Sequence, residues 1–575
     1  MPISYDQRVP KFRDRVWLIA PVLLLLALYW PGLTSWFQQD DFGWLNLRQD
    51  VHSASDLASA LFAPKAHGNL RPLGENAYWL GLNATFGMNA LPFHLLAFVV
   101  QAASLLLLAG IVRRLTGSTL AASAAAMLWV VNPGLAYAMG WCSIFNQVLS
   151  GFFLLMAFYA LLRWVESGDR RFAFWHWAAF VLGLGALEIN VVYPALAALY
   201  TLLFARPYLK RVLPMFVVSA AMVALHFHVA PPPETGAYAP QLDSIVFSTL
   251  RTYWDWGLGS MTLPLTALAL AGTVWSLWRR DYLPLLALAW FLFPVLPYLS
   301  LPQHTMPYYL AVPAIGIAML GALAIRKSPL GAALALLLYI VPNVRASWTA
   351  TNWQHERAEK IEDLVLGVEE IHRSAPGKVI LLEGIDNFVF WAGVADLPFR
   401  AAGIPGVYLA PGNGNPIQAP AGLLTKYTLP SGLARGALLY RFDGQMLHAE
   451  TGREWDEEAP RFVNLGDPVF APMLGAGWGT ARDGARRMER TGTLRIGAPR
   501  QMGESLYLGV FETRPFRWVV KVNGADLAMN VVGRENNLTE FRAQLPGEYT
   551  GTKELEIQVS CDLPGGLLFG YAEVR

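Results

Sequence analysis

Two adjacent carboxylates, Asp40 and Asp41, are the residues of this chain best suited to carry chemistry. They follow an apolar run at 16–30 that no charge interrupts. A charge at the centre of a bilayer costs roughly 3 kcal/mol or more, so the pair is expected at the membrane interface or in a wet cavity. There it can accept a proton, hold a cation or orient a hydroxyl group. The alternative is that the pair caps a helix or lies in a solvated loop.

The composition is that of a membrane protein with a soluble part attached. Of the 575 residues, 54% are hydrophobic and only 15% are charged, whereas soluble domains carry roughly a quarter charged residues. The net charge of +2 provides no basic field, so no nucleic-acid partner is expected.

Apolar stretches of about 20 residues can span a bilayer, and the first 345 residues contain about eleven candidates. They lie near 16–33, 91–112, 118–137, 145–163, 173–189, 191–205, 212–230, 261–278, 282–300, 307–325 and 329–345. Arginine and lysine residues collect at alternate loops and at the N-terminal segment, which predicts that these face the cytoplasm. The loop with the acid pair and everything after residue 345 are then outside. We therefore expect a multi-pass protein of a bacterial inner membrane, with its C-terminal part in the periplasm.

Beyond residue 350 the pattern changes to that of folded soluble structure. Domain boundaries are predicted at 1–350 for the membrane part, 351–480 for a helix and a mixed α/β segment, and 481–575 for a jelly-roll-like β-sandwich. The stretch 353–372 has amphipathic helical spacing, and 506–511, 518–522, 540–545 and 555–559 alternate as strands do. Asn523-Gly524 is typical of a hairpin turn.

Five short motifs occur in a fixed order along the membrane part. They are the acid pair, Arg71-Pro72-Leu73, Phe93-His94-Leu95, Leu187-Glu188-Ile189-Asn190 with Pro194, and Tyr308-Tyr309-Leu310 with Pro313 and Gly316. This order resembles the GT-C-type polytopic glycosyltransferases, most closely the protein O-mannosyltransferases and the tetratricopeptide-bearing O-mannosyltransferases. Two positions depart from the family pattern: Leu187 stands where lysine is usual, and Gln303-His304 replaces Glu-Arg.

The resemblance implies a GT-C-like helical domain that moves a sugar, with inversion, from a polyprenyl-phosphate donor to an acceptor hydroxyl. The acceptor would be a glycan or a protein on the outer face, and membrane lipid is a further partner. In these families the first acid of the pair is the general base, which makes Asp40 the expected base and Asp41 the alternative. No cofactor is implied with certainty. A divalent cation at the acid pair is left open, and no other metal site is expected.

The candidates for substrate binding are polar residues in outer loops or at the ends of spans: Arg71, His94, Glu188, Asn190, His304 and Tyr308. Arg71 can fork onto phosphate oxygens or extend to lipid headgroups, and His304 is a phosphate donor or a plain loop residue. Glu188 and Asn190 bind substrate or hydrogen-bond between helices. For His94, packing within the bundle is the favoured alternative.

Two other classes of protein compete with an enzyme. A transporter or flippase of lipid-linked glycans would also need many spans, but the charged residues do not lie in mid-span and no inverted repeat of broken helices is evident. A non-enzymatic glycan-binding membrane protein needs one span as an anchor, so about eleven would be unexplained. Neither class has an evident need for Asp40 in an outer loop.

Overall fold

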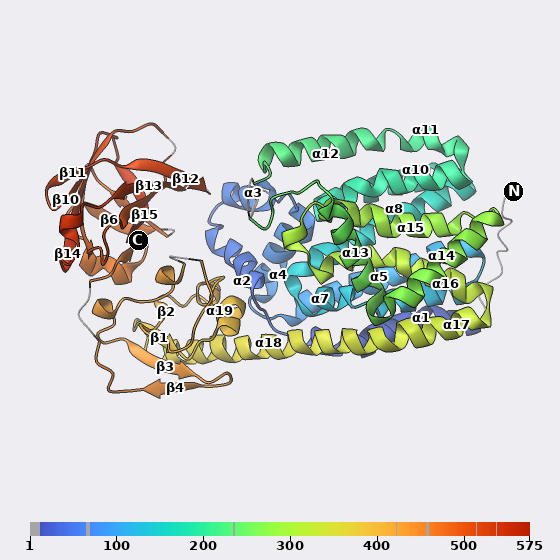
Figure 1. Cartoon of the computed structure of the whole chain (residues 1–575), viewed down its shortest axis with the longest axis horizontal. Helices are drawn as coiled ribbons and strands as arrows, with labels where there is room; N and C mark the ends of the chain where they lie inside the picture. Colours follow the sequence, from blue (N-terminus) through green and yellow to red (C-terminus); the bar gives the residue numbers. More distant parts are fainter. Residues whose placement is uncertain are drawn as a thin grey trace. The chain divides into compact units, whose positions relative to one another are not determined.

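The computed structural model describes residues 12–64, 69–233, 236–420, 423–455, 459–482, 484–512, 514–535 and 538–575. The chain divides into two compact units, Met1–Glu359 and Lys360–Arg575 (Figure 1). The first unit is helical and apolar, and the second is rich in β-strands. This agrees with the predicted order of a helical membrane-type region followed by a β-rich part.

The first unit consists of helices joined by turns and loops. Their bounds are α1 Phe12–Leu33, α2 Asp40–Leu45, α3 Ala54–Phe62, α4 Tyr78–Phe86, α5 Leu91–Thr116, α6 Thr119–Val130, α7 Gly134–Gly140, α8 Phe145–Ser167, α9 Arg170–Ala186, α10 Tyr193–Phe204, α11 Leu209–Val212, α12 Met215–Val229, α13 Ile245–Leu258, α14 Thr262–Trp278, α15 Leu283–Val295, α16 Ala314–Lys327, α17 Pro329–Ala335 and α18 Val341–Ser374. Helix α18 continues past Glu359 into the second unit.

Fewer helices than expected are long and apolar enough to cross a membrane. In the described part of the chain there are five such helices, or six if the bent pair α6 and α7 counts as one span. The five are Leu91–Thr116, Cys142–Ser167, Arg206–Val229, Ile245–Trp278 and Pro329–Ser374. Every one of the eleven predicted stretches is largely helical, but several are short or broken. In α1, for example, Pro21 and Pro31 lie inside the helix and Tyr29 leaves helical geometry, because proline removes a backbone donor and crowds the preceding turn. The count of eleven spans is therefore not confirmed.

Small residues allow the helices to approach closely. Helix α8 packs against α5 and α9, and α16 packs against α6 and α15. A Cβ atom on Gly316 of α16 would lie 2.4 Å from the carbonyl oxygen of Ala287 in α15. Without a hydrophobic force between helices in lipid, such backbone-to-backbone packing is a main source of stability.

A short π-helical turn, Pro72–Ala77, lies against the end of α9 and positions residues of the site described below. A Cβ atom on Gly74 would lie 2.1 Å from the carbonyl oxygen of Ala186, so only glycine fits this contact. Gly185 of α9 also faces the side chains of Pro72 and Leu73. The turn thereby places Arg71, which precedes it, and Glu75, which lies within it, next to the segment between α9 and α10.

The second unit begins with the end of α18 and a small mixed sheet. The sheet has the order β2-β1-β3-β4, with bounds β1 Ile380–Glu383, β2 Val407–Leu409, β3 Leu438–Phe442 and β4 Leu447–Glu450. Strand β1 is parallel to both β2 and β3, and β4 returns antiparallel to β3. Helices α19 Asn387–Gly393 and α20 Pro398–Ala401 connect β1 to β2.

Two antiparallel sheets form a β-sandwich around one core. One sheet has the order β11-β10-β14-β8, and the other β12-β13-β9-β15-β7-β6 with β5 beside β15. Their bounds are β5 Phe462–Asn464, β6 Trp478–Arg482, β7 Ala485–Met488, β8 Thr491–Gly497, β9 Ser505–Val510, β10 Trp518–Val522, β11 Ala525–Leu527, β12 Asn530–Glu535, β13 Leu538–Gln544, β14 Glu554–Cys561 and β15 Leu567–Val574. Buried residues of both sheets, such as Ile557 and Phe569, belong to the same core. The hairpin turn predicted at Asn523-Gly524 is confirmed, since both residues have positive φ between β10 and β11.

The contact of Gly74 with Ala186 gives a direct test of the packing. Gly74→Ala should lower the free energy of unfolding by about 1–3 kcal/mol, because the added methyl group overpacks a backbone contact. Gly81→Ala is the matched control: nothing lies within 4 Å of its added Cβ, and alanine favours a helix interior by up to about 1 kcal/mol. The measurement is the melting temperature of both variants in the same detergent. Equal melting temperatures for the two variants would contradict the packing.

Candidate functional site

Asp40 and Asp41 begin helix α2, and their two carboxylates lie in different surroundings. Gln39, just before the pair, has a φ of +54°, a left-handed conformation that a residue other than glycine adopts only where its surroundings hold it there. The backbone bends at this point, so that Asp41 is fully buried while Asp40 is exposed. Only Asp40 is therefore open to a substrate.

Asp41 ties α2 to the turn Cys142–Ile144 that precedes α8. Its Oδ1 accepts hydrogen bonds from the Ser143 backbone N–H (2.8 Å) and from the Ser143 hydroxyl (2.6 Å). Its Oδ2 accepts from the backbone N–H of Gln38 at 3.0 Å. Burial raises the pKa of Asp41 from 3.8 to about 7, although these hydrogen bonds act in the opposite direction. The geometry makes Asp41 a residue that positions its neighbour.

Asp40 lies among groups of both signs. Arg357, Glu75, Tyr238 and Tyr308 are all within electrostatic range of its carboxylate. The pKa of Asp40 is raised above its ordinary value, first because the surrounding protein displaces solvent, and Arg357 opposes this shift. A carboxylate that is exposed and yet has a raised pKa has the two properties of a general base.

Arg357, on α18, is a member of the site that the sequence motifs did not indicate. Its Nη2 donates to Oε1 of Gln39 at 2.7 Å, and its guanidinium lies 5.4 Å from the ring centre of Trp353. A single arginine in an amphipathic stretch of sequence does not indicate that the residue belongs to a functional site. Only the fold, which brings α18 beside the start of α2, identifies it.

Arg71 connects two of the predicted motifs through ion pairs. Its Nε donates to Glu188 at 2.6 Å, and its Nη1 donates to Glu75 at 2.5 Å. Glu75 also accepts from Nδ2 of Asn146 at 2.7 Å, and Glu188 accepts from the backbone N–H of Leu70 at 3.2 Å. The structure thus brings Arg71 and Glu188 together, a contact that the sequence did not predict, and it adds Glu75 and Asn146, which the sequence analysis missed. The four-residue spacing of Arg71 and Glu75 was the available signal. A direct contact of Arg71 with a phosphate stays a prediction.

Aromatic side chains from two segments gather beside this network. Tyr309 stacks on Tyr298 with ring centres 3.9 Å apart, and Tyr308 lies 4.7 Å from Tyr309. His304 lies 4.3 Å from the ring of Tyr238, in the loop before α13, and 5.9 Å from Tyr309. The structure therefore brings His304 and Tyr308 into one cluster, and Tyr238 is an addition that the sequence did not suggest.

Two of the predicted binding residues lie inside the helical packing. His94 is buried, and its Nε2 is 3.3 Å from Sγ of Cys142. Asn190 is also buried, and its Nδ2 donates to Ser150 Oγ at 2.8 Å and to the carbonyl of Gly183 at 2.9 Å. Both side chains hold helices together in this arrangement, which is the alternative considered for each. Their roles toward a substrate stay predictions.

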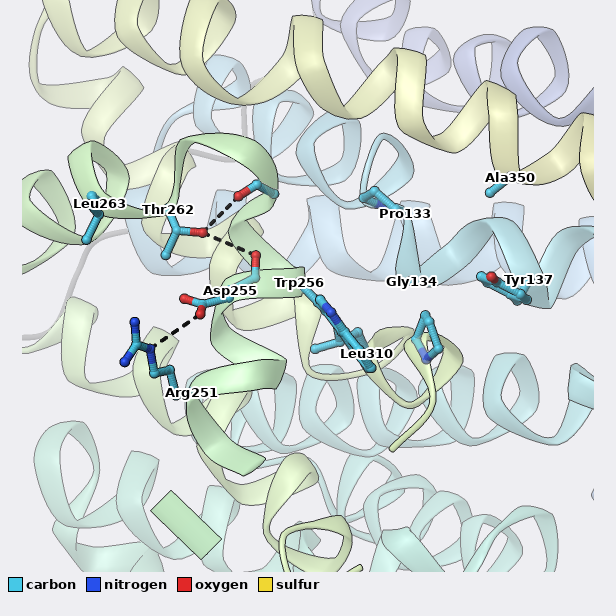
Figure 2. A pocket seen from close by; sticks show the side chains of 12 residues that line it. Pro133, Gly134, Tyr137, Arg251, Asp255, Trp256, Thr262, Leu263, Leu310 and Ala350 are labelled. Carbon is cyan, nitrogen blue, oxygen red and sulfur yellow. Dashed lines mark hydrogen bonds and ion pairs between the residues drawn. The ribbon is translucent and has the colours of Figure 1, made fainter. Parts of the chain in front are cut away.

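A cavity of about 580 Å³ lies beside the Tyr308 motif (Figure 2). Its lining is mostly apolar and comes from five segments: Pro133, Gly134, Tyr137, Arg251, Asp255, Trp256, Gly259, Thr262, Leu263, Pro307, Leu310 and Ala350. Pro307 and Leu310 flank Tyr308 and Tyr309, so the polar cluster and the cavity share one short 3-10 turn, Pro307–Leu310.

One wall of this cavity carries charge. Figure 2 shows Arg251 and Asp255 on α13, with Nε and Oδ2 3.6 Å apart, and Tyr137 of α7 on the opposite side. Tyr137 is within electrostatic range of Arg357, which relates this cavity to the surroundings of Asp40. Its volume lies in the range of roughly 300–1,000 Å³ that is usual for small-molecule sites.

The carboxylates of Asp40 and Asp41 are not directed at a common position where both could bind one cation. Both oxygens of Asp41 accept hydrogen bonds from protein donors, so only Asp40 of the pair is open. No group of three or more histidine, cysteine, aspartate or glutamate side chains is placed to hold a metal ion within the ranges that the structure describes. Whether a cation binds at Asp40 stays a prediction.

Comparisons with known proteins give likeness in structure only. No protein-family model and no curated protein sequence matches the chain. ArnT from Cupriavidus metallidurans, solved with bound undecaprenyl phosphate, is 14% identical with a TM-score of 0.43 over 74% of this chain and 93% of ArnT. An oligosaccharyltransferase from Archaeoglobus fulgidus, tethered to an acceptor peptide, is 14% identical with a TM-score of 0.39 over 68% of this chain and 63% of its own.

A third similar structure is arabinosyltransferase EmbB from Mycobacterium smegmatis. It is 13% identical with a TM-score of 0.35, over 100% of this chain and 65% of EmbB. These three neighbours are GT-C glycosyltransferases, and they do not confirm the O-mannosyltransferase branch. At these identities and TM-scores, the likeness alone carries no conclusion about the donor, acceptor or mechanism of this chain.

The raised pKa of Asp41 predicts how its contribution to stability changes with pH. The folded protein holds a proton at Asp41 up to about pH 7, whereas the unfolded chain releases it near 3.8. This contribution is fully present below about pH 4 and is lost as the pH rises through about 7. Asn cannot titrate, so the melting temperature of the wild type minus that of Asp41→Asn should fall over this window. Asp50→Asn, at an exposed position of the same loop, is the control. A constant difference between wild type and Asp41→Asn would contradict the shift.

Proposed function

We propose that this protein is an inverting glycosyltransferase that moves a sugar from a polyprenyl-phosphate donor to an acceptor hydroxyl at the outer face of a bacterial inner membrane. The observation that carries the proposal is Asp40, an exposed carboxylate with a raised pKa that lies within electrostatic range of Arg357 and Tyr308. Tyr308 belongs to the turn Pro307–Leu310, whose ends line an apolar cavity of about 580 Å³. A transporter or a glycan receptor does not need that combination.

Asp40 acts as the general base in this proposal. It takes the proton from the acceptor hydroxyl as the acceptor oxygen forms a bond to C1 of the sugar. The bond between C1 and the phosphate oxygen breaks on the opposite face, and its electron pair leaves with the polyprenyl phosphate. A raised pKa makes Asp40 a stronger base than an ordinary carboxylate.

The leaving phosphate needs positive or hydrogen-bonding groups, which stabilise the charge that develops on it. Arg357 is our first candidate, because it lies within electrostatic range of Asp40 and its guanidinium can pair with phosphate oxygens. His304 and Tyr308 supply further donors from the aromatic cluster. Arg71 takes part through its ion pairs, which hold the surrounding loops in place.

The polyprenyl chain would lie in the apolar cavity. Trp256, Leu263 and Leu310 give it an apolar surface, and Arg251 lies at its charged wall. The cavity shares the turn Pro307–Leu310 with the aromatic cluster, so a lipid phosphate at the polar end can have its chain in the cavity. A mannose-like hexose as the sugar, and a glycan or protein as the acceptor, follow from the sequence resemblance.

Asp40→Asn tests the base. The variant keeps the shape of the side chain and removes the proton acceptor, so the turnover number should fall by roughly 10²–10⁴ while donor binding is unchanged. The assay uses purified protein with a panel of synthetic polyprenyl-phosphate hexoses and pentoses, and it measures release of polyprenyl phosphate. Asp50→Asn, in the same outer loop, should retain full activity.

The outcomes separate the alternatives for the acid pair. Asp41→Asn should lose less activity than Asp40→Asn, because Asp41 only positions α2. Equal losses in the two variants would point to a shared cation or proton instead. Near-normal transfer by Asp40→Asn would show that Asp40 is not the base, and absence of release from every donor in the wild type would overturn the transferase proposal.

A further inference from the structure

The second unit contains a cavity of its own, of about 430 Å³, at one edge of the mixed sheet. Its lining residues are Glu383, Gly384, Asp386, Val389, Asn413, Gly414, Asn415, Arg441, Phe442, Asp443 and Gly444. They lie at or after the carboxyl ends of the three strands that run parallel, β1, β2 and β3. In open sheets with parallel strands, this edge is where ligands bind. None of these residues takes part in the site of the first unit.

Hydrogen bonds between loops fix the walls of this cavity. The side chain of Asn413 accepts from the backbone N–H of Ile385 at 3.0 Å and donates to its carbonyl at 2.6 Å. Asn415 donates to the carbonyl of Gly384 at 2.8 Å. The loop after β2 is therefore held against the loop after β1. A binding site whose walls are already fixed loses little conformational entropy when a ligand binds.

The lining carries three carboxylates, those of Glu383, Asp386 and Asp443, and one guanidinium, that of Arg441. Glu383 is 8% exposed and pairs with Arg453 at 2.7 Å and with Arg441 at 3.4 Å. The other two carboxylates are Asp386, whose Oδ1 caps α19 at Val389, and Asp443, which binds His448 at 2.7 Å. The cavity thus combines carboxylate acceptors with a guanidinium donor, and the two arginines that pair with Glu383 offset part of its negative charge.

A neutral saccharide matches this chemistry. Each sugar hydroxyl both donates and accepts a hydrogen bond, so it can use an aspartate and an arginine or asparagine at once. A phosphate would face three carboxylates, and an apolar ligand would leave their polar groups unpaired. We infer that this cavity binds a neutral saccharide, a hexose or a short oligosaccharide. The further claim that this saccharide is part of the acceptor rests on the proposed function. The claim that the cavity binds a saccharide does not.

Asp386→Asn tests the site without removing the helix cap, because asparagine caps helices as well as aspartate does. The variant replaces one acceptor oxygen by an amide donor. We expect roughly a 10-fold or greater loss of saccharide affinity, the usual effect of losing a hydrogen bond to a charged group. The experiment uses the full-length protein in detergent and a panel of free hexoses and short oligosaccharides, with binding measured by calorimetry. Asp562→Asn is the matched control, since Asp562 also accepts from a backbone N–H, that of Arg517, but in the sandwich.

The inference predicts that the wild type, Asp562→Asn and Asp40→Asn bind the same saccharide equally well. It is overturned if no member of the panel binds the wild type, if Asp386→Asn binds as tightly as the wild type, or if inorganic phosphate displaces the saccharide. Saccharide binding that persists in a protein without sugar-transfer activity would overturn the proposed function and leave this site standing.

Discussion

The buried carboxylate of Asp41 is the constraint on which the rest of the site depends. A polar group without hydrogen-bond partners is costly to bury, so Asp41 needs the donors of Ser143 and Gln38, and these fix α2 against the turn before α8. Gln38 extends the same connection, because its side chain donates to the carbonyls of Gly140 and Gln354. Burial of Asp41 therefore fixes the position of its neighbour Asp40, whose side chain is exposed.

The ion pairs of Arg71 are a second support, built from residues far apart in the sequence. Arg71 joins the π-helical turn to Glu188 at the start of the segment before α10, and the turn reaches α9 only because Gly74 lacks a side chain. Charged groups that satisfy one another in this way can remain close to a bilayer. They leave the start of α8, the end of α9 and the start of α10 in a fixed arrangement beside the aromatic cluster.

The sequence predicted local features better than contacts. Apolar stretches placed most helices of the first unit, alternation placed β9, β10, β13 and β14, and the hairpin at Asn523-Gly524 followed from turn chemistry alone. The other strands of the sandwich, such as β8 and β15, were not predicted. The number of spans could not be predicted as well, because internal prolines and polar breaks shorten helices that composition alone makes equal. Within the site, the sequence indicated the acid pair but could not say that Asp41 is buried and Asp40 exposed, since that depends on the backbone at Gln39. Arg357 came from the fold alone.

The central claim is that the helical unit holds a polyprenyl phosphate beside Asp40. Native mass spectrometry of the protein purified from its membrane, with polyprenyl phosphate added to the detergent solution, tests it most directly. The account predicts a complex with one polyprenyl phosphate or its glycosylated form, which is lost when Leu263 and Leu310 are both replaced by aspartate in the cavity. A protein that carries only ordinary phospholipids, and does not bind added polyprenyl phosphate, would contradict the account.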